Sequence, residues 1–321
     1  MVLEAVYEQD FLDCSYGFRP GRSAHQALNS LWHEVMKMGG GWVYEVDIQS
    51  FFDELDHGHV RSFLDRRVRD GVLRRTIDKW LNAGVMEAGR QSYPESGTPQ
   101  SGVISPLLAN VYLHEVLDTW FEREVQPRLR GRAFLFRYAD DFVMVFELKG
   151  DAPRVAEVLS KRLARFGLRL HPEKTRLVRF QRPARGKSPD RSQRPGTFDL
   201  LGFTHYWGKG LNGSYALKRR TSKARMRRSL RRLNEWCRLH RHYPRPWQHE
   251  QLSRKLRGYD NYYGITGNFV ALVRFRRRLL WIWRQWLNRR SQRKGVTWKR
   301  FYKYLKSNPI PRPYITHPAI P

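Results

Sequence analysis

The sequence predicts an α+β region followed by an all-helical region. Over roughly the first 210 residues, stretches with apolar residues at every third or fourth position alternate with short runs rich in β-branched and aromatic residues. After about residue 208 acidic residues become rare, and basic and aromatic residues dominate stretches of helical spacing. We therefore expect two domains, residues 1–210 and 211–321, each of ordinary size.

Local patterns predict the elements of the first region. Apolar residues at helical spacing predict a helix over residues 23–38, which the glycines that begin at Gly39 end. Alternating, β-rich residues predict a strand over Trp42–Ile48. The remaining expected elements are helical residues 57–83, a Gly/Pro loop at 96–102, a helix over 106–125, hairpin strands 133–138 and 142–146, a helix over 152–166 and a strand within 197–206.

Helical spacing dominates the second region. It predicts helices at 221–241, 247–263, 269–290 and 297–307. The third has an apolar side, which we expect to face the core, and an arginine-rich side suited to phosphate; a membrane-surface helix is the alternative. Its apolar side consists of Leu279, Ile282, Trp283 and Trp286. Before this region, residues 181–196 are polar, basic and rich in proline, which favours a solvated loop over a specific contact surface.

The charge balance indicates a polyanionic partner. The chain has 60 Lys and Arg against 30 Asp and Glu, a net charge of +30. A surplus of this size repels itself unless something anionic neutralises it. Arginine outnumbers lysine, and guanidinium groups fork onto phosphate and stack on bases. With 11 Trp, 15 Tyr and 17 Phe among these charges, nucleic acid is the favoured partner, and a basic ribosomal-type protein is the alternative.

Several classes of protein are excluded. Cys14 and Cys237 are the only cysteines, so a disulfide framework or a cysteine-rich zinc site is not expected, and a reducing compartment suits the chain. The sequence has no apolar run of membrane-spanning length, so we expect no membrane partner. Its first residues lack the basic and apolar regions of a signal peptide.

Three aspartates stand out in a chain poor in acid. Asp47 ends a predicted strand, and Asp140 and Asp141 form the tip of the predicted hairpin. Carboxylates brought together repel each other and raise their own pKa values, and divalent cations such as Mg²⁺ relieve that repulsion. Two such ions about 4 Å apart catalyse phosphoryl transfer. An Asp pair in a turn is also common for conformational reasons alone, so the prediction depends on several motifs occurring in order.

Six blocks in order carry a resemblance to a known family. They are CSYGFRPGRSAHQAL at 14–28, VDIQSFFDELDH at 46–57, SGTPQSGVISPLLANVYLHEVLD at 96–118, YADD at 138–141, GLRLHPEKTRLVRF at 167–180 and FDLLGF at 198–203. Together they resemble the reverse transcriptases that group II introns encode. The resemblance implies a right-hand polymerase palm with partial fingers over residues 1–210, and a helical thumb and maturase region (domain X) over 211–321.

The resemblance also implies catalytic and nucleotide-binding residues. Asp47 and Asp140 would ligate two Mg²⁺ ions, and Asp141 would complete this catalytic cluster. Four further residues would bind the nucleotide: the backbone of Ile48, the ring of Phe52, Gln100 and Lys174. Phe52, with its neighbour Phe51 as the alternative, would exclude a 2′-hydroxyl, although core packing explains such a pair equally well. Lys174 would lie near the triphosphate or the carboxylates, with a solvated helix-end lysine as the alternative.

RNA-binding residues follow from two blocks. Arg19 and Arg22 would face template phosphate or help to shape the fingers. In LRGYDNYYGITGNF at 256–269, Arg257 and Tyr259 would neutralise phosphate and stack on unpaired bases; the alternative is that the tyrosines pack between helices. This C-terminal resemblance is looser than the one over the palm.

The implied function is RNA-directed DNA polymerisation coupled to intron binding. The partners would be an RNA template, a DNA primer, dNTPs and group II intron RNA, in a bacterial cytoplasm or nucleoid. Family members normally carry further fingers sequence upstream of the SYGFRPGRS block, where this chain begins. Two alternatives therefore stay open: a splicing maturase with weak or no polymerase activity, and a stand-alone reverse transcriptase used in defence. Second-strand DNA cleavage is not expected, because no Cys/His-rich endonuclease segment is present.

Overall fold

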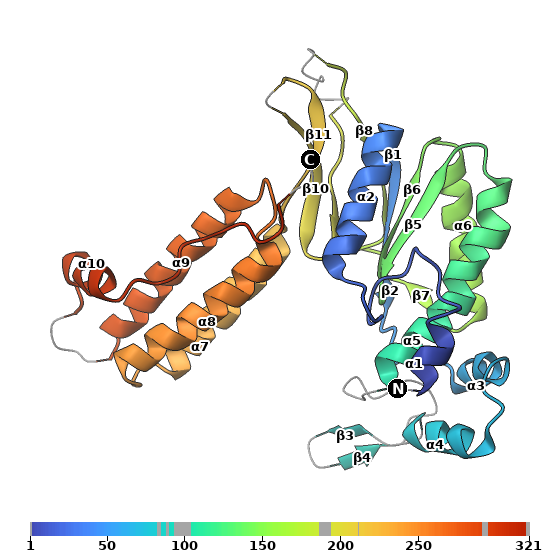
Figure 1. Ribbon diagram of the computed structural model, residues 1–321, viewed down its shortest axis with the longest axis horizontal. Helices are drawn as coiled ribbons and strands as arrows, with labels where there is room; N and C mark the ends of the chain where they lie inside the picture. The colour runs from blue at the N-terminus through green and yellow to red at the C-terminus, as the bar shows by residue number, and fades with distance from the viewer. Residues whose placement is uncertain are drawn as a thin grey trace. The chain divides into compact units, whose positions relative to one another are not determined.

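The computed structural model describes residues 2–81, 85–87, 90–92, 104–185, 194–210, 212–290 and 295–318 (Figure 1). The chain forms two compact units. Unit 1 comprises Met1–Leu201 with Trp207–Leu217, and unit 2 comprises Gly202–Tyr206 with Lys218–Pro321. The chain therefore passes between the units just before β10 (Phe203–Lys209), again within β10, and once more within β11 (Tyr215–Thr221). The function that the sequence assigns to each region stays a prediction.

A four-stranded antiparallel sheet is the centre of unit 1. Its order is β5-β6-β1-β8, so β1, first in the chain, lies between two strands that come much later. Val46 of β1 pairs with Phe142 of β6, which sets the register at the edge where the aspartates lie. The strands are β1 (Gly40–Val46), β5 (Ala133–Tyr138), β6 (Asp141–Phe146) and β8 (Arg176–Gln181).

Glycines join α2 (Ala24–Met38) to this sheet. Ser23 caps the start of the helix by accepting from the Gln26 backbone N–H, and Gly39 ends it in the left-handed conformation, φ 78°. Gly40 and Gly41, expected to lie outside the strand, instead begin β1. A Cβ at either position would collide with a carbonyl oxygen of the neighbouring strand, Phe180 or Phe146, so only glycine fits.

Helices surround the sheet of unit 1. Figure 1 shows α2 in front of the sheet, and both α2 and α6 pack against β1. The predicted helix over 106–125 is present but changes type, since α5 continues into two π-helical turns. The helical segments are α1 (Val2–Tyr7), α3 (His57–Asp65), α4 (Gly71–Leu81), α5 (Ser105–Leu113), η1 (His114–Asp118), η2 (Phe121–Val125), η3 (Gln126–Arg128) and α6 (Asp151–Arg165).

Among the described residues, three smaller sheets contain the remaining strands. The order β11-β10-β9 places β10 centrally, and β9 is Phe198–Leu200. The short strands β2 (Ile48–Gln49) and β7 (Arg169–Leu170) pair with each other. A further pair consists of β3 (Val85–Glu87) and β4 (Arg90–Ser92).

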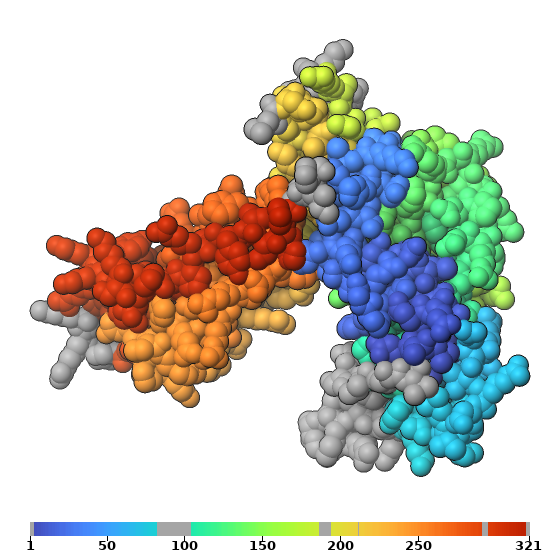
Figure 2. Space-filling view, viewed as in Figure 1, coloured from blue at the N-terminus to red at the C-terminus, as the bar shows by residue number. Residues whose placement is uncertain are grey.

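Unit 2 is mainly helical, as predicted. Figure 1 shows α7 (Lys223–Leu239), α8 (Arg245–Tyr263) and α9 (Phe269–Asn288) side by side, and α10 (Trp298–Ser307) follows. Trp283 is fully buried among them and donates to Gln248 Oε1 at 2.8 Å, whereas Trp286 is only half-buried. The segment after α10 returns along the surface of this unit (Figure 2), where His317 bridges to Ile265. No helix in the described ranges is long and apolar enough to cross a membrane.

Candidate active site

The three predicted aspartates meet at one edge of the central sheet. Asp47 directly follows Val46, and Val46 pairs with Phe142, the residue after Asp141. The antiparallel register therefore places Asp47 beside the start of β6, and Asp140 lies in the adjoining hairpin turn. Ala139 forms that turn in the left-handed conformation, φ 57°. Residues separated by more than 90 positions thus come together through strand pairing.

The carboxylates at this edge influence each other's ionisation. Desolvation by the surrounding protein raises the pKa of Asp141 to about 6, although its side chain still reaches solvent. That value of about 6 already includes two smaller effects: the Leu201 N–H, 3.0 Å from Oδ2, lowers the pKa, and the negative charges of Asp140, Asp47 and Glu45 raise it. Burial and the charge of Asp47 also raise the pKa of Asp140. A cluster of this kind favours neutralisation by a cation.

Lys174 supplies one such cation. Its Nζ lies 2.6 Å from Asp47 Oδ2, with the side chains 61% and 34% exposed. The segment that carries it is tied to the end of β1, because the His171 N–H donates to the Asp47 carbonyl at 2.8 Å. The structure therefore places Lys174 beside the carboxylates, which was one of its two expected positions.

The cluster suits a divalent ion by its donor chemistry. Carboxylate oxygens are the ligands that Mg²⁺ prefers, and mutual repulsion would be relieved by its charge. Within the ranges that the structure describes, however, no group of three or more His, Cys, Asp or Glu side chains is arranged as a metal site. One oxygen of Asp47 pairs with Lys174, and one oxygen of Asp141 accepts from the Leu201 backbone N–H.

The predicted nucleotide-binding residues differ in their placement. Ile48 is buried and pairs with Leu170 across β2 and β7. Phe51 is 2% exposed and belongs to the core, whereas Phe52 is half-buried, with its ring 5.2 Å from that of Phe51. Of the two rings, Phe52 is the one that reaches the surface. Gln100 lies outside the described residues.

Arg19 and Arg22 are both occupied by contacts within unit 1. Arg19 is 7% exposed, holds the Glu8 carboxylate with two nitrogens and donates to the carbonyls of Leu12 and Ser15. This placement argues against the predicted RNA contact and favours the alternative role of shaping the fingers. Arg22 is more exposed and pairs with Asp13 at 2.5 Å.

Arg257 and Tyr259, both predicted to bind RNA, differ in their exposure. Arg257 is exposed on α8 and accessible to a ligand. Tyr259 is 8% exposed, and its ring stacks on Phe275 of α9 at a centroid distance of 3.6 Å. Base stacking on Tyr259 would require the two helices to part, so this structure argues against that RNA contact. Helical spacing could not distinguish the two faces of α8 in advance.

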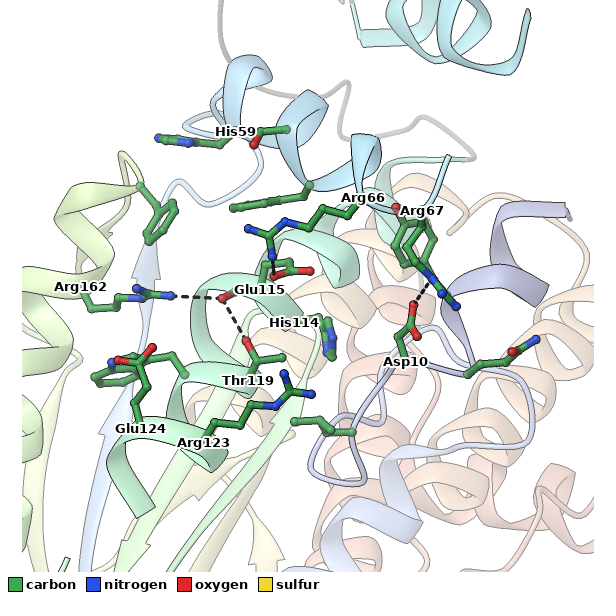
Figure 3. Close-up of a pocket in the computed structure, with 17 residues that line it drawn as sticks. Asp10, His59, Arg66, Arg67, His114, Glu115, Thr119, Arg123, Glu124 and Arg162 are labelled. Carbon is green, nitrogen blue, oxygen red and sulfur yellow. Dashed lines mark hydrogen bonds and ion pairs between the residues drawn. The ribbon is translucent and has the colours of Figure 1, made fainter. Parts of the chain in front are cut away.

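Unit 1 also contains a separate cavity that the sequence did not predict. It has a volume of about 860 Å³ and contains none of the predicted site residues. Figure 3 shows Arg66 and Arg162 directed toward Glu115, and Arg67 directed toward Asp10. Its lining comes from several segments distant in sequence, and no local motif marks them.

Comparisons with known proteins agree with this geometry. Residues 1–205 match the family model described as reverse transcriptase (RNA-dependent DNA polymerase). The group II intron-encoded protein LtrA of Lactococcus lactis subsp. cremoris is 30% identical over 86% of this chain and 57% of its own length. Protein YkfC of Escherichia coli (strain K12) is 33% identical over 49% of this chain and 48% of its own length. The chain thus spans less than two thirds of these relatives.

A solved structure resembles the chain in fold alone. Apo telomerase from Candida tropicalis superposes with a TM-score of 0.50 at 10% identity, over 89% of this chain and 52% of that one. This likeness agrees with the predicted α+β palm followed by a helical region. Because the family model covers nearly all of unit 1, including the sheet edge with its three aspartates, the chain belongs to the reverse transcriptase family.

Proposed function

We propose that this chain is an RNA-directed DNA polymerase of a group II intron, which extends a DNA primer on an RNA template and binds intron RNA to assist splicing and mobility. The meeting of Asp47, Asp140 and Asp141 at one sheet edge carries the proposal. A pair of bound Mg²⁺ ions would activate the primer hydroxyl and stabilise the leaving pyrophosphate. Asp47 and Asp140 would hold them, with Asp141 completing the charge of the cluster.

In this proposal, Lys174 pairs first with Asp47 and then with the incoming nucleotide. It now neutralises Asp47 through a partly exposed ion pair. Once a metal ion takes the place of the lysine at the carboxylate, this long, flexible side chain can pair with an incoming triphosphate instead. Nucleotide selection is assigned to Phe52, whose partly exposed ring would meet the sugar edge, together with the Ile48 backbone and Gln100.

Intron RNA binding is assigned to unit 2. Helix α7 buries only Leu233 and Cys237, and its exposed surface is strongly basic. Arginine heads spaced along a helix neutralise successive phosphates and release counterions. The exposed basic residues of α7 are Lys223, Arg225, Arg227, Arg228, Arg231, Arg232 and Arg238. Arg257 of α8 adds to this charge.

Primer extension tests the polymerase proposal. With a homopolymer RNA, a DNA primer, dNTPs and Mg²⁺, Asp140→Ala should abolish extension and leave RNA affinity unchanged. Asp53→Ala, an exposed aspartate from the same sequence block as Asp47, is the matched control and should extend normally. Extension that survives Asp140→Ala would exclude the metal assignment.

The basic surface of α7 also favours a second candidate, a splicing maturase that does not polymerise. Under this alternative, the Asp140→Ala protein and the parent assist splicing equally, and neither extends a primer. Removing the charge of Arg227 and Arg231 should then reduce splicing and intron binding together. Intron binding that is unchanged by both substitutions would count against a role for these two arginines.

A further inference from the structure

A charged side chain lies near the end of the strand that leads into the Asp140 turn. Arg137 of β5 is completely buried. Its Nε and Nη2 bind the two oxygens of Asp118 at 2.8 and 2.5 Å, and Asp118 is equally buried. Its Nη1 donates to Asn110 Oδ1 at 2.9 Å and to the Ala139 carbonyl at 3.0 Å. The guanidinium therefore connects two helical residues to the turn itself.

The turn is also held from the opposite side. The Tyr16 N–H donates to the Arg137 carbonyl at 2.9 Å, and the Arg137 N–H donates to the Cys14 carbonyl at 2.8 Å. Gly17 then passes so close to Ala139 that a Cβ at Gly17 would collide with the Ala139 nitrogen. Ala139, with φ 57°, is a non-glycine residue in a conformation that costs free energy unless its surroundings impose it.

The π-helical turn over His114–Asp118 explains how both helical partners reach Arg137. Asn110 and Asp118 are eight residues apart, which in a regular α-helix would separate them by about 80° around the axis. The wider turn over His114–Asp118 reduces that angle, so both side chains face the same guanidinium. Asn110 also donates to the Gly17 carbonyl at 2.6 Å, which joins the two sides of the turn.

We propose that Arg137 is a positioning residue for the Asp140 carboxylate. It fixes the carbonyl of Ala139, the residue immediately before Asp140, and so sets where Asp140 stands relative to Asp47. Asp118 neutralises most of its charge, so its effect on Asp140 is mainly geometric. This inference rests on the proposed function, because it assumes that Asp140 holds a metal ion.

The test needs a variant that folds without the tether. Arg137→Met alone leaves Asp118 charged, buried and unpaired, so this variant can fail to fold. The double variant Arg137→Met/Asp118→Leu replaces both charges by apolar groups of similar size and should keep a melting temperature near that of the parent. Since small misplacements of a reacting group cost up to about 100-fold, we expect kcat for nucleotide addition to fall by about that factor. The KM for RNA template–primer should not change.

Metal binding gives a readout that does not require catalysis. Supporting residues around metal ligands typically change affinity by about 10- to 100-fold, so the double variant should bind Mn²⁺ at least about tenfold more weakly by electron paramagnetic resonance. Arg132→Met/Glu147→Leu is the matched control. It removes an ion pair of 3.1 Å from the opposite end of the same hairpin, and it should leave kcat and Mn²⁺ affinity unchanged.

The outcomes separate the inference from the proposed function. A double variant with parental stability, kcat and Mn²⁺ affinity would overturn the positioning role. Full activity in Arg137→Lys would do so too, since lysine keeps the charge but not the forked contacts. If Asp140→Ala still extends primers, or if the parent binds no Mn²⁺, the proposed function fails. If Asp140→Ala is inactive while the double variant behaves like the parent, only the positioning role fails.

Discussion

Replacing Lys174 by methionine should strengthen metal binding and weaken nucleotide use. Lys174 pairs with Asp47 at 2.6 Å and therefore competes with any cation for that carboxylate. Because the two side chains are 61% and 34% exposed, solvent screens the pair, and such pairs contribute up to about 1 kcal/mol. Since 1.4 kcal/mol is a tenfold change in an equilibrium constant, the loss of this competitor should tighten metal binding by about fivefold.

Two measurements with opposite expected signs check this reasoning. Mn²⁺ titration without nucleotide should show the roughly fivefold tighter binding in Lys174→Met. Steady-state primer extension should show a lower kcat/KM for dNTP, because the triphosphate loses its lysine. Arg169→Met is the control, since Arg169 is an exposed cation whose partner, Glu54, lies outside the aspartate cluster. Unchanged or weaker Mn²⁺ binding in Lys174→Met would refute the competition between lysine and metal.

Three further predictions concern stability, sugar selection and RNA binding. Asp260 is fully buried with no hydrogen-bond partner for either oxygen among the described residues, and burial raises its pKa to about 6. Because the pKa of Asp260 is higher in the folded than in the unfolded state, the free energy of unfolding is larger below about pH 4. It should fall by up to about 3 kcal/mol as the pH rises toward 6. In urea unfolding, Asp260→Asn should remove this loss. Phe52→Ala should raise ribonucleotide incorporation at least about tenfold in single-nucleotide extension, because the ring no longer excludes the 2′-hydroxyl. Tyr259→Leu should leave RNA affinity unchanged because the ring is internal. By contrast, Arg227→Ala/Arg231→Ala should make the slope of log K against log salt concentration shallower by about 0.7 per lost phosphate contact.

Each of these expectations can be contradicted directly. Equal pH dependence of unfolding in the parent and Asp260→Asn would mean that the carboxyl is not desolvated. Unchanged discrimination in Phe52→Ala would assign sugar selection to another residue. A large loss of RNA affinity in Tyr259→Leu at parental stability would show that the ring leaves its position on Phe275 to bind RNA.

Local sequence patterns predicted many of the longer elements of this protein. The helix at 24–38, the hairpin around Asp140 and the four helices of unit 2 lie within a few residues of their predicted bounds. Such elements bury one face, so their apolar residues recur with the period of the helix or strand. The edge that gathers Asp47 with Asp140 was also foreseen, from the order of motifs along the chain. Strand β8 was missed, because its two basic residues, Arg176 and Arg179, are three positions apart and do not follow the two-residue period of a strand.

The tertiary structure alone decided which polar side chains are free to act. Arg19 and Tyr259 carry the residue types of an RNA contact, but distant segments bury them. Arg137 and Asp118 form a buried pair, and Lys174 reaches Asp47 across more than 120 residues. Periodicity reports how a residue faces its own helix or strand, whereas burial and ion pairing depend on which remote segments pack against it. For that reason the sequence located the carboxylates, and only the folded chain showed what holds them in place.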